Sequence, residues 1–214
     1  MVINSKAYWD GRFSTGNWVN SHGGAQTEFF TEIAIRNLPV WLIEHINRDS
    51  LEVCDVGCAQ GEGCALLKKT FTNSRIIGID FSESALLIAR EKFPSIEFFC
   101  ESIHALQARH DVIYASNVLE HFENPIEVIQ KLLDQTNHYL VILVPFQERH
   151  RFGEHLATFD YHSFPLRVGG FQLTYHKEMN CAPEPNTRYH GLQILVIYAK
   201  GDGFTLENFI SRPQ

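Results

Sequence analysis

The sequence predicts an α/β domain in which a mostly parallel sheet is covered by helices on both faces. Short apolar runs alternate with segments of helical length between Leu51 and Val144. Strands that are separated by helices pair in parallel, because each helix carries the chain back across the sheet. With 214 residues the chain fits one domain that can bury a sizeable core. We therefore expect residues 1–214 to form a single domain.

The first 30 residues precede this alternation and are rich in glycine, asparagine and aromatic residues. A free tail does not carry so many aromatic side chains, so we expect residues 1–30 to fold over the domain as an N-terminal lid. Residues 27–47 have an imperfect helical period, which Pro39 should divide into two helices. The segment from Gly23 to Thr27 is then the expected hinge between the lid and the first helix.

Five strands and three helices are expected in the middle of the chain. The predicted strands are residues 51–56, 75–80, 96–100, 112–116 and 139–144, and the predicted helices are residues 62–70, 82–92 and 125–133. Ser82 is a good N-cap for the second of these helices. Two further strands, 171–176 and 193–200, have no helix between them and predict an antiparallel hairpin at the sheet edge. The result is a seven-stranded mixed sheet whose last strand is antiparallel.

The most informative segment runs from Leu51 to Gly63 and contains three glycines between a strand and a helix. Glycine there lets the backbone turn tightly and approach a ligand, because no Cβ stands in the way. Open α/β sheets bind ligands beyond the carboxyl ends of their strands, which is where this turn lies. The spacing of Gly57 and Gly61 matches neither the G-x-G-x-x-G dinucleotide motif nor a phosphate-binding loop. Asp80 closes the next strand, where a carboxylate suits the two hydroxyls of a ribose.

Residues 50–145 resemble the class I S-adenosylmethionine-dependent methyltransferases. The run Asp55-Val-Gly-Cys-Ala-Gln-Gly61 is similar to the family motif D-x-G-x-G-x-G, with Ala59 in place of the middle glycine. Residues 77–82 resemble the ribose-binding segment of the family, residues 99–102 its adenine-binding segment and residues 111–122 its fourth strand. The resemblance implies a Rossmann-like fold and S-adenosyl-L-methionine as the cofactor.

The resemblance also assigns the residues expected to bind the cofactor, which are Tyr8, Arg12, Asp55, Gly57, Gly61, Asp80, Phe81, Glu101, Ser102 and Asn117. Asp80 is expected at the ribose and Glu101 at the adenine amino group, with a solvated surface carboxylate as the alternative for Glu101. Asp55 either approaches the methionine amino group or only orients the glycine turn. Arg12 is expected to pair with the methionine carboxylate. The alternative for the lid is that Tyr8 and its aromatic neighbours merely pack against the sheet.

Methyl transfer from a sulfonium is an in-line displacement, so the protein has to position the acceptor and help to remove its proton. Histidine is the natural base near neutral pH, and the chain has 11 of them. His121 follows the fourth strand, and His155 and His162 follow the fifth, in a region that commonly covers the substrate in this family. These three are the catalytic candidates, and satisfied structural histidines are the alternative.

The composition limits the partners and the location of the chain. A formal net charge of −7 and the lack of a basic run argue against nucleic-acid binding. No stretch is long and apolar enough to span a bilayer and no signal peptide is read, so we expect a cytoplasmic protein without membrane insertion. The 5 cysteines have no metal-ligand spacing and are expected to be reduced, packed thiols, so no metal site is predicted from spacing. Scattered Asp, Glu and His residues could form a divalent-metal site that spacing does not reveal, so metal dependence is left open. The oligomeric state is not predicted.

Residues 146–164 supply the mixture of aromatic and polar side chains that suits a sugar, which has apolar ring faces and several hydroxyls. Residues 154–165 and 190–198 look similar to methyltransferases of bacterial surface-glycan and deoxysugar pathways. We therefore expect O-methylation of a hydroxyl on a sugar or glycan, with a solvated cap as the alternative for residues 146–164. N- or C-methylation of another small molecule, a non-catalytic cofactor-binding module and a dehydrogenase remain as alternative functions, and the glycine spacing argues against the last.

Overall fold

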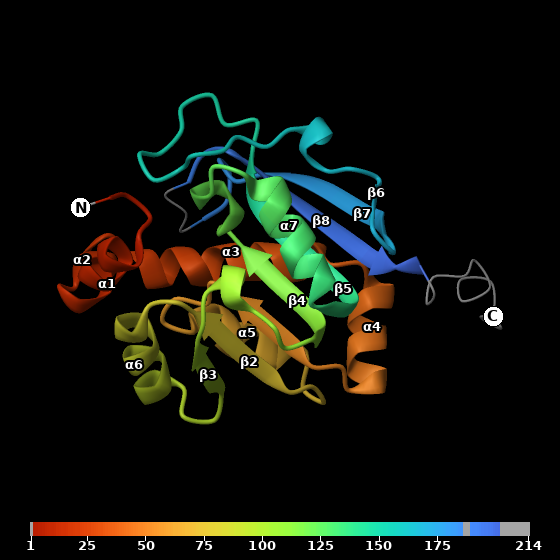
Figure 1. Ribbon diagram of the computed structural model, residues 1–214, viewed down its shortest axis with the longest axis horizontal. Helices are drawn as coiled ribbons and strands as arrows, with labels where there is room; N and C mark the ends of the chain where they lie inside the picture. Colours follow the sequence, from red (N-terminus) through yellow and green to blue (C-terminus); the bar gives the residue numbers. More distant parts are fainter. Residues whose placement is uncertain (1, 186–188, 202–214) are drawn as a thin grey trace.

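The computed structural model describes residues 2–185 and 189–201, which form one sheet with helices packed against it (Figure 1). The strands are β1 (Val53–Val56), β2 (Ile76–Asp80), β3 (Glu97–Cys100), β4 (His110–Ser116), β5 (Thr136–Phe146), β6 (Arg167–Val168), β7 (Phe171–Asn180) and β8 (Leu192–Lys200). The α-helices are α1 (Lys6–Ser14), α2 (Asn17–Asn20), α3 (Gly23–Asn37), α4 (Val40–Asp49), α5 (Glu62–Thr70), α6 (Glu83–Lys92) and α7 (Pro125–Asp134). Three short 3-10 turns are η1 (Ile103–Ala105), η2 (Leu119–His121) and η3 (Tyr161–Ser163).

The sheet has eight strands in the order β3-β2-β1-β4-β5-β8-β7-β6. Strands β1 to β5 pair in parallel, and β8 pairs antiparallel with both β5 and β7. This confirms the predicted mixed sheet with an antiparallel last strand. The predicted number of seven strands is one too few, because Arg167 and Val168 turn back through Gly169 to pair with the start of β7. A two-residue strand leaves no apolar run that sequence periodicity could detect.

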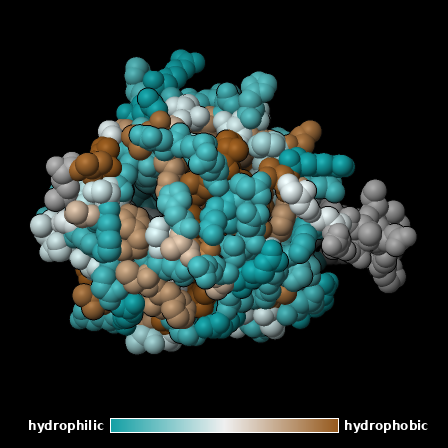
Figure 2. Space-filling view, viewed as in Figure 1, coloured by the Kyte–Doolittle hydropathy of each residue, from teal (hydrophilic) through white to brown (hydrophobic). Residues whose placement is uncertain are grey.

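Both faces of the central strands are buried, because successive side chains of β5 enter two different cores. Tyr139 and Val141 pack in the cluster that holds the apolar side chains of α3, α4, α5 and α6. Leu140 and Ile142 pack in the cluster that holds those of α7. Since side chains alternate along a strand, the two clusters lie on opposite faces of the sheet. The face seen in Figure 2 is mostly hydrophilic, as expected when helices cover the apolar faces of the sheet.

Several helix boundaries follow from local chemistry that the sequence displays. The Ser82 hydroxyl accepts a hydrogen bond from the Ala85 amide, so α6 begins where the N-cap predicts. Pro39 separates α3 from α4, as expected. The predicted hinge from Gly23 to Thr27 is wrong, because these residues form the first turns of α3. A Cβ on Gly23 would overlap the Trp18 ring, so Gly23 serves close packing between α2 and α3 rather than bending.

Helices α1 and α2 lie at the end of the molecule where the glycine turn and α6 are found (Figure 1). Phe13 of α1 is buried against Ala59 and Ala85, so the N-terminal helices pack on the domain. No helix in the described part of the chain is long and apolar enough to cross a membrane.

The turn after β1 contains a residue in a strained conformation. Ala59 has a φ of 48°, in the left-handed region, which costs an L-residue about 1–2 kcal/mol. Its amide donates to Oδ2 of Asp80 over 3.0 Å, which fixes the turn against the end of β2. Ala59 stands where the family motif has a glycine, and glycine adopts this conformation without the steric cost.

Ala59→Gly is therefore expected to raise the free energy of unfolding by about 0.5–1 kcal/mol, because relief of the strain outweighs the added freedom of the unfolded chain. Urea denaturation measures the difference. Ala65→Gly is the matched control, since Ala65 lies inside α5 and the same change there should lower the free energy by about 0.5–1 kcal/mol. Equal destabilisation by both substitutions contradicts a strained turn at Ala59.

Candidate active site

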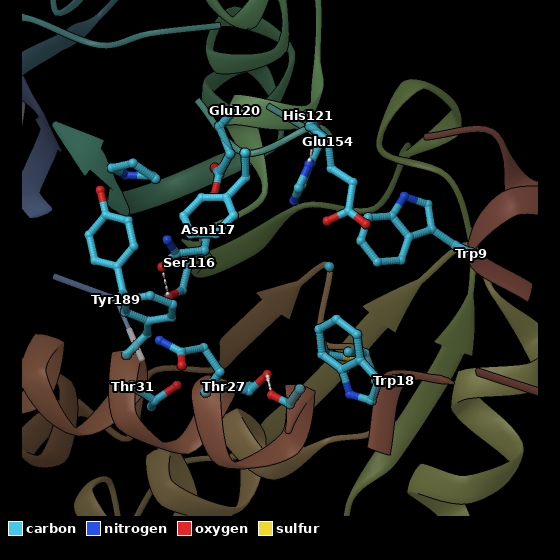
Figure 3. A pocket seen from close by; sticks show the side chains of 18 of the residues that line it. Trp9, Trp18, Thr27, Thr31, Ser116, Asn117, Glu120, His121, Glu154 and Tyr189 are labelled. Atoms are coloured by element: carbon cyan, nitrogen blue, oxygen red, sulfur yellow. Dashed lines mark hydrogen bonds between the residues drawn. The ribbon is translucent and has the colours of Figure 1, made fainter. Parts of the chain in front are cut away.

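Two cavities meet beyond the carboxyl ends of β1 and β4. The first cavity has a volume of about 400 Å³ and the second of about 680 Å³. Both are lined by Trp9, Trp18, Gly57, Ala59, Asn117 and His121. In Figure 3, the side chains of Glu120 and His121 lie on one wall of the first cavity, and Thr27 and Thr31 of α3 lie on the opposite wall. Trp9 and Trp18 lie at one side. A ligand that occupies both cavities has to pass the glycine turn.

Gly57 and Gly61 of the turn differ in that only Gly57 lines the cavities. Gly57 lines both cavities and has a φ of 76°, and a Cβ added to it would overlap the side chain of Val118. Gly61 has a φ of 86°, and its Cβ would come within 2.8 Å of Phe98. Gly61 is absent from the lining of both cavities, so it allows close packing of α5 instead of ligand contact.

Asp80 is buried at the end of β2 and lines the second cavity. Its Oδ1 accepts from the Ser82 amide over 2.8 Å and its Oδ2 accepts from the Ala59 amide over 3.0 Å. Burial raises the pKa of Asp80 to about 6, and these two hydrogen bonds oppose the rise. Each carboxylate oxygen keeps a further lone pair, so the group can still accept from a pair of hydroxyls.

The predicted cofactor residues beyond β2, β3 and β4 also line cavities. Phe81, Glu101 and Ser102 line the second cavity beside Asp80. Glu101 is half-buried, and Ser102 caps η1 by accepting from the His104 amide. Asn117 lies in the left-handed region with a φ of 52° and lines both cavities. The predicted contacts of these residues with a cofactor stay predictions.

Asp55 lies on the floor of the first cavity and is buried. The Cys64 thiol donates to its Oδ2 over 3.3 Å, and burial raises the pKa of Asp55 to about 7. A buried carboxylate at a cavity wall attracts a cationic group such as an amine. The geometry accommodates both sequence expectations for Asp55, namely support of the turn and contact with an amino group.

The N-terminal helix is tied to the loop after β5 through one carboxylate. Arg12 forms an ion pair with Glu154, and the Tyr8 hydroxyl donates to Glu154 over 2.5 Å. The Asn4 amide donates to the backbone oxygens of His121 and Glu154. Arg12 lines the first cavity, but Tyr8 lines neither cavity. The structure therefore does not bring Tyr8 to the predicted cofactor site, where its neighbour Trp9 lies instead.

The structure brings together two of the three candidate histidines. His121 lines both cavities and His155 lines the first, with their ring centroids 5.4 Å apart. Burial lowers the pKa of His121 to about 4, so this imidazole stays neutral at physiological pH. His162 is exposed on η3 and lines neither cavity. The sequence order after β5 cannot separate His155 from His162, because the intervening chain has no regular period.

Sequence reasoning does not single out several parts of the site, among them Glu120, Glu148, Glu154 and Trp18. Glu120 precedes His121 on η2, lines the first cavity and is buried. Burial raises its pKa to about 8. Glu148 holds Nδ1 of His155 over 2.7 Å. Glu120 could have been found from the sequence, because it is a carboxylate directly before the predicted base His121. The Glu148–His155 contact could not, because it depends on the conformation of the loop after β5.

Comparison with known proteins identifies the family. Residues 29–173 match the model of a methyltransferase domain family. A trans-aconitate 2-methyltransferase of Rhodopseudomonas palustris (strain BisB18) is 29% identical over 127 residues, which are 50% of this chain and 50% of the relative. A malonyl-[acyl-carrier protein] O-methyltransferase of Bacillus cereus is 31% identical over 87 residues, 39% of this chain and 32% of the relative. The chain thus spans about half or less of the length of these relatives.

Solved structures share the fold. Magnesium protoporphyrin IX methyltransferase from Synechocystis PCC 6803 with bound S-adenosylhomocysteine superposes with a TM-score of 0.70 at 15% identity, over 92% of this chain and all of that chain. The plantazolicin methyltransferase in complex with S-adenosylhomocysteine and a substrate analogue gives a TM-score of 0.60 at 15% identity, over 91% of this chain and 97% of that chain. The chain belongs to the methyltransferase domain family, with the class I S-adenosylmethionine-dependent fold that the glycine motif predicts. This membership removes the dehydrogenase alternative.

Asp80→Asn should weaken binding of S-adenosylhomocysteine about ten- to more than a hundred-fold, since hydrogen bonds to a charged acceptor contribute roughly 1.5–3 kcal/mol. Calorimetric titration measures the affinity. Asp134→Asn, at an exposed position at the end of α7, is the control and should bind like the wild type. Unchanged affinity in a folded Asp80→Asn protein contradicts the ribose contact.

The same contact predicts a pH dependence. Because the pKa of Asp80 is about 6, its charge is lost as the pH falls through that value, and wild-type affinity should fall with it. The decrease should be smaller in Asp80→Asn.

Proposed function

We propose that this protein transfers a methyl group from S-adenosylmethionine to a hydroxyl of a sugar or glycan. The adenosine part fits the second cavity, with its ribose at Asp80 and its adenine near Glu101 and Ser102. The methionine part then passes Gly57 toward Asp55, and the acceptor enters the first cavity. The observation that carries the proposal is that the two cavities share Asn117 and His121 at their junction, where methyl donor and acceptor have to meet.

The residues of the turn fit the cofactor. Gly57 lines both cavities, and a Cβ there would overlap Val118, so glycine lets the turn lie this close to Val118 at the junction of the cavities. Asp80 offers lone pairs to the ribose. Burial raises the pKa of Asp55 to about 7, and an ammonium group beside it would favour its charged form. Trp18 Nε1 and Gln26 Nε2 are buried donors without a hydrogen-bond partner among the described residues, and both side chains line the first cavity. Buried donors of this kind are satisfied when a polar ligand or water is bound.

The lining of the first cavity suits a neutral acceptor with several hydroxyls. Aromatic side chains that can pack on a sugar ring are Trp9, Trp18, Phe30, Phe152 and Tyr189. Polar side chains that can bond its hydroxyls are Gln26, Thr27, Thr31 and Ser116. The one Lys or Arg among the described lining residues is Arg12, which is already paired with Glu154. A polycarboxylate such as trans-aconitate would find little compensating positive charge there.

S-adenosylmethionine, when bound, supplies a methyl group activated by its sulfonium sulfur. His121 and His155 stand where the acceptor hydroxyl has to lie. His121 stays neutral, so its free nitrogen can accept a hydrogen bond from the hydroxyl and orient its oxygen toward the methyl group. His155 is oriented by Glu148, which would stabilise the imidazole if it takes up the hydroxyl proton. Helices α1 and α2 act as the lid, because Trp9, Arg12 and Trp18 line the first cavity.

The lid proposal predicts a selective effect of Arg12→Ala. If Arg12 exchanges Glu154 for the methionine carboxylate, the substitution should weaken S-adenosylhomocysteine binding about tenfold or more. Binding of methylthioadenosine, which lacks that carboxylate, should be unchanged. Arg36→Ala is the control, because Arg36 pairs with Glu184 outside the cavities. An equal loss for both ligands contradicts the carboxylate contact and leaves a packing role for Arg12.

The acceptor proposal predicts where a labelled methyl group goes. Incubation with labelled cofactor and a panel of sugars, nucleotide sugars, amines, phenols and carboxylic acids should label a sugar hydroxyl. His121→Ala should lower this turnover more than ~100-fold, with little change in cofactor affinity. Label only on amines, phenols or carboxylates contradicts the sugar proposal. Cofactor binding without transfer to any acceptor favours the non-catalytic module.

A further inference from the structure

Three potential metal ligands converge in the first cavity. One ligand atom each from Glu120, His121 and His155 lies within 4.8 Å of the others. Glu120 and His121 are neighbours on η2, and His155 comes from the loop after β5. The amides of Leu156 and Ala157 donate to the Glu120 carbonyl over 2.7 and 3.1 Å. These bonds hold the two chain segments together, so the cluster is fixed by the backbone.

Both imidazoles have one nitrogen engaged and the other available. Nδ1 of His121 lies 3.0 Å from the carbonyl oxygen of Glu154, which can only accept, so Nδ1 carries the proton. Nδ1 of His155 lies 2.7 Å from Oε2 of Glu148. A carboxylate or carbonyl that accepts from Nδ1 leaves the lone pair on Nε2, which is the usual support for a metal-binding histidine. The side chain of Glu148 is 7% exposed, so this support is itself buried.

Two buried carboxylate oxygens near the cluster have no partner. Glu120 is 1% exposed, and its Oε2 has no hydrogen-bond partner among the described residues. The same holds for Oε1 of Glu148. Burial of a polar oxygen without a partner is costly. A cation bound by the Glu120 carboxylate would give its unpartnered oxygen a partner to contact.

We propose that Glu120, His121 and His155 bind one divalent metal ion of the zinc class in the first cavity. Two imidazole nitrogens and one carboxylate oxygen are a ligand set that zinc and similar ions use when one position stays open. Ligands ~2.0–2.1 Å from a tetrahedral ion lie about 3.3 Å apart, so the side chains have to close in by rotation when the ion binds. The three ligands share the lining of the first cavity with Gln26, Thr27 and Tyr189, so a ligand in that cavity could reach the open position.

The consequence for catalysis rests on the proposed function. An acceptor hydroxyl takes the open position, and the ion lowers the pKa of that hydroxyl, whose proton passes to solvent. The oxygen–methyl bond then forms while the carbon–sulfur bond breaks with its electron pair on sulfur. With the ion bound, both histidines act as ligands rather than bases.

Metal binding is measured on the 214-residue chain without cofactor or acceptor, so the result does not depend on the proposed function. After treatment with a chelator, calorimetric titration with zinc should give one site per chain. Glu120→Gln and His155→Ala should each weaken it at least ~100-fold, and Glu148→Gln about 10- to 100-fold. His176→Ala and Glu178→Gln, exposed on β7, are the matched controls and should bind like the wild type.

Two outcomes overturn the site. One is no zinc binding by the wild type, in which case the histidines bind the acceptor directly. The other is binding that Glu120→Gln and His155→Ala retain, which points to thiols such as the exposed Cys100. The absorption spectrum of cobalt bound to the wild type identifies the ligand atoms, so this test works even if a variant fails to fold. Ligation by nitrogen and oxygen gives ligand-field bands alone, whereas thiolate ligation adds intense sulfur-to-cobalt charge transfer and contradicts the proposal.

If the chain binds zinc as predicted but transfers no methyl group to any sugar, the metal site is supported and the sugar proposal is contradicted. Binding of S-adenosylhomocysteine by Glu120→Gln at wild-type affinity separates loss of metal from loss of the cofactor site.

Discussion

The left-handed turn at Gly57 is the constraint on which the site depends. Its amide donates to the Ile79 carbonyl over 2.7 Å, which ties the end of β1 to the end of β2. On its other side the turn packs so closely on Val118 that no side chain fits at Gly57. The ends of β1, β2 and the segment after β4 therefore meet at one point. Gly57 lies at this point and lines both cavities.

The ionisable side chains around the Gly57 turn are mostly carboxyl groups. Asp55, Asp80 and Glu120 are all buried, and burial raises the pKa of each. The same burial lowers the pKa of His121, so the nearest imidazole adds no positive charge at neutral pH. Removing carboxylates from water is unfavourable unless a cation or hydrogen-bond donors replace the water. A ligand that brings a sulfonium and an ammonium, or a metal ion, supplies what the protein side chains lack.

Local patterns predicted much of the fold. The glycine turn, the Ser82 cap and Pro39 each act within a few residues, so the sequence displays their effect directly. The placement of Asp80 beside the turn followed from strand order, since β1 and β2 are parallel neighbours. The Gly23 hinge failed because glycine also permits close helix packing, and the Trp18 ring that fills the space is not implied by the pattern.

The contacts made by the loop after β5 could not be read from the sequence, because that segment is irregular. Glu154 binds both Tyr8 and Arg12 across 146 and 142 residues of sequence. His155 reaches the cavity and His162 does not, although both follow the same strand. Neither fact has a periodic signal, because the loop after β5 is held by individual hydrogen bonds to side chains and to η2.

A crystal structure with bound S-adenosylhomocysteine tests the central claim most directly. We expect adenosine in the second cavity with its ribose hydroxyls on Asp80, and homocysteine in the first cavity near Asp55. The sulfur should lie at the junction beside Asn117 and His121. Adenosine in the first cavity, or a ligand that leaves the passage at Gly57 empty, contradicts the account.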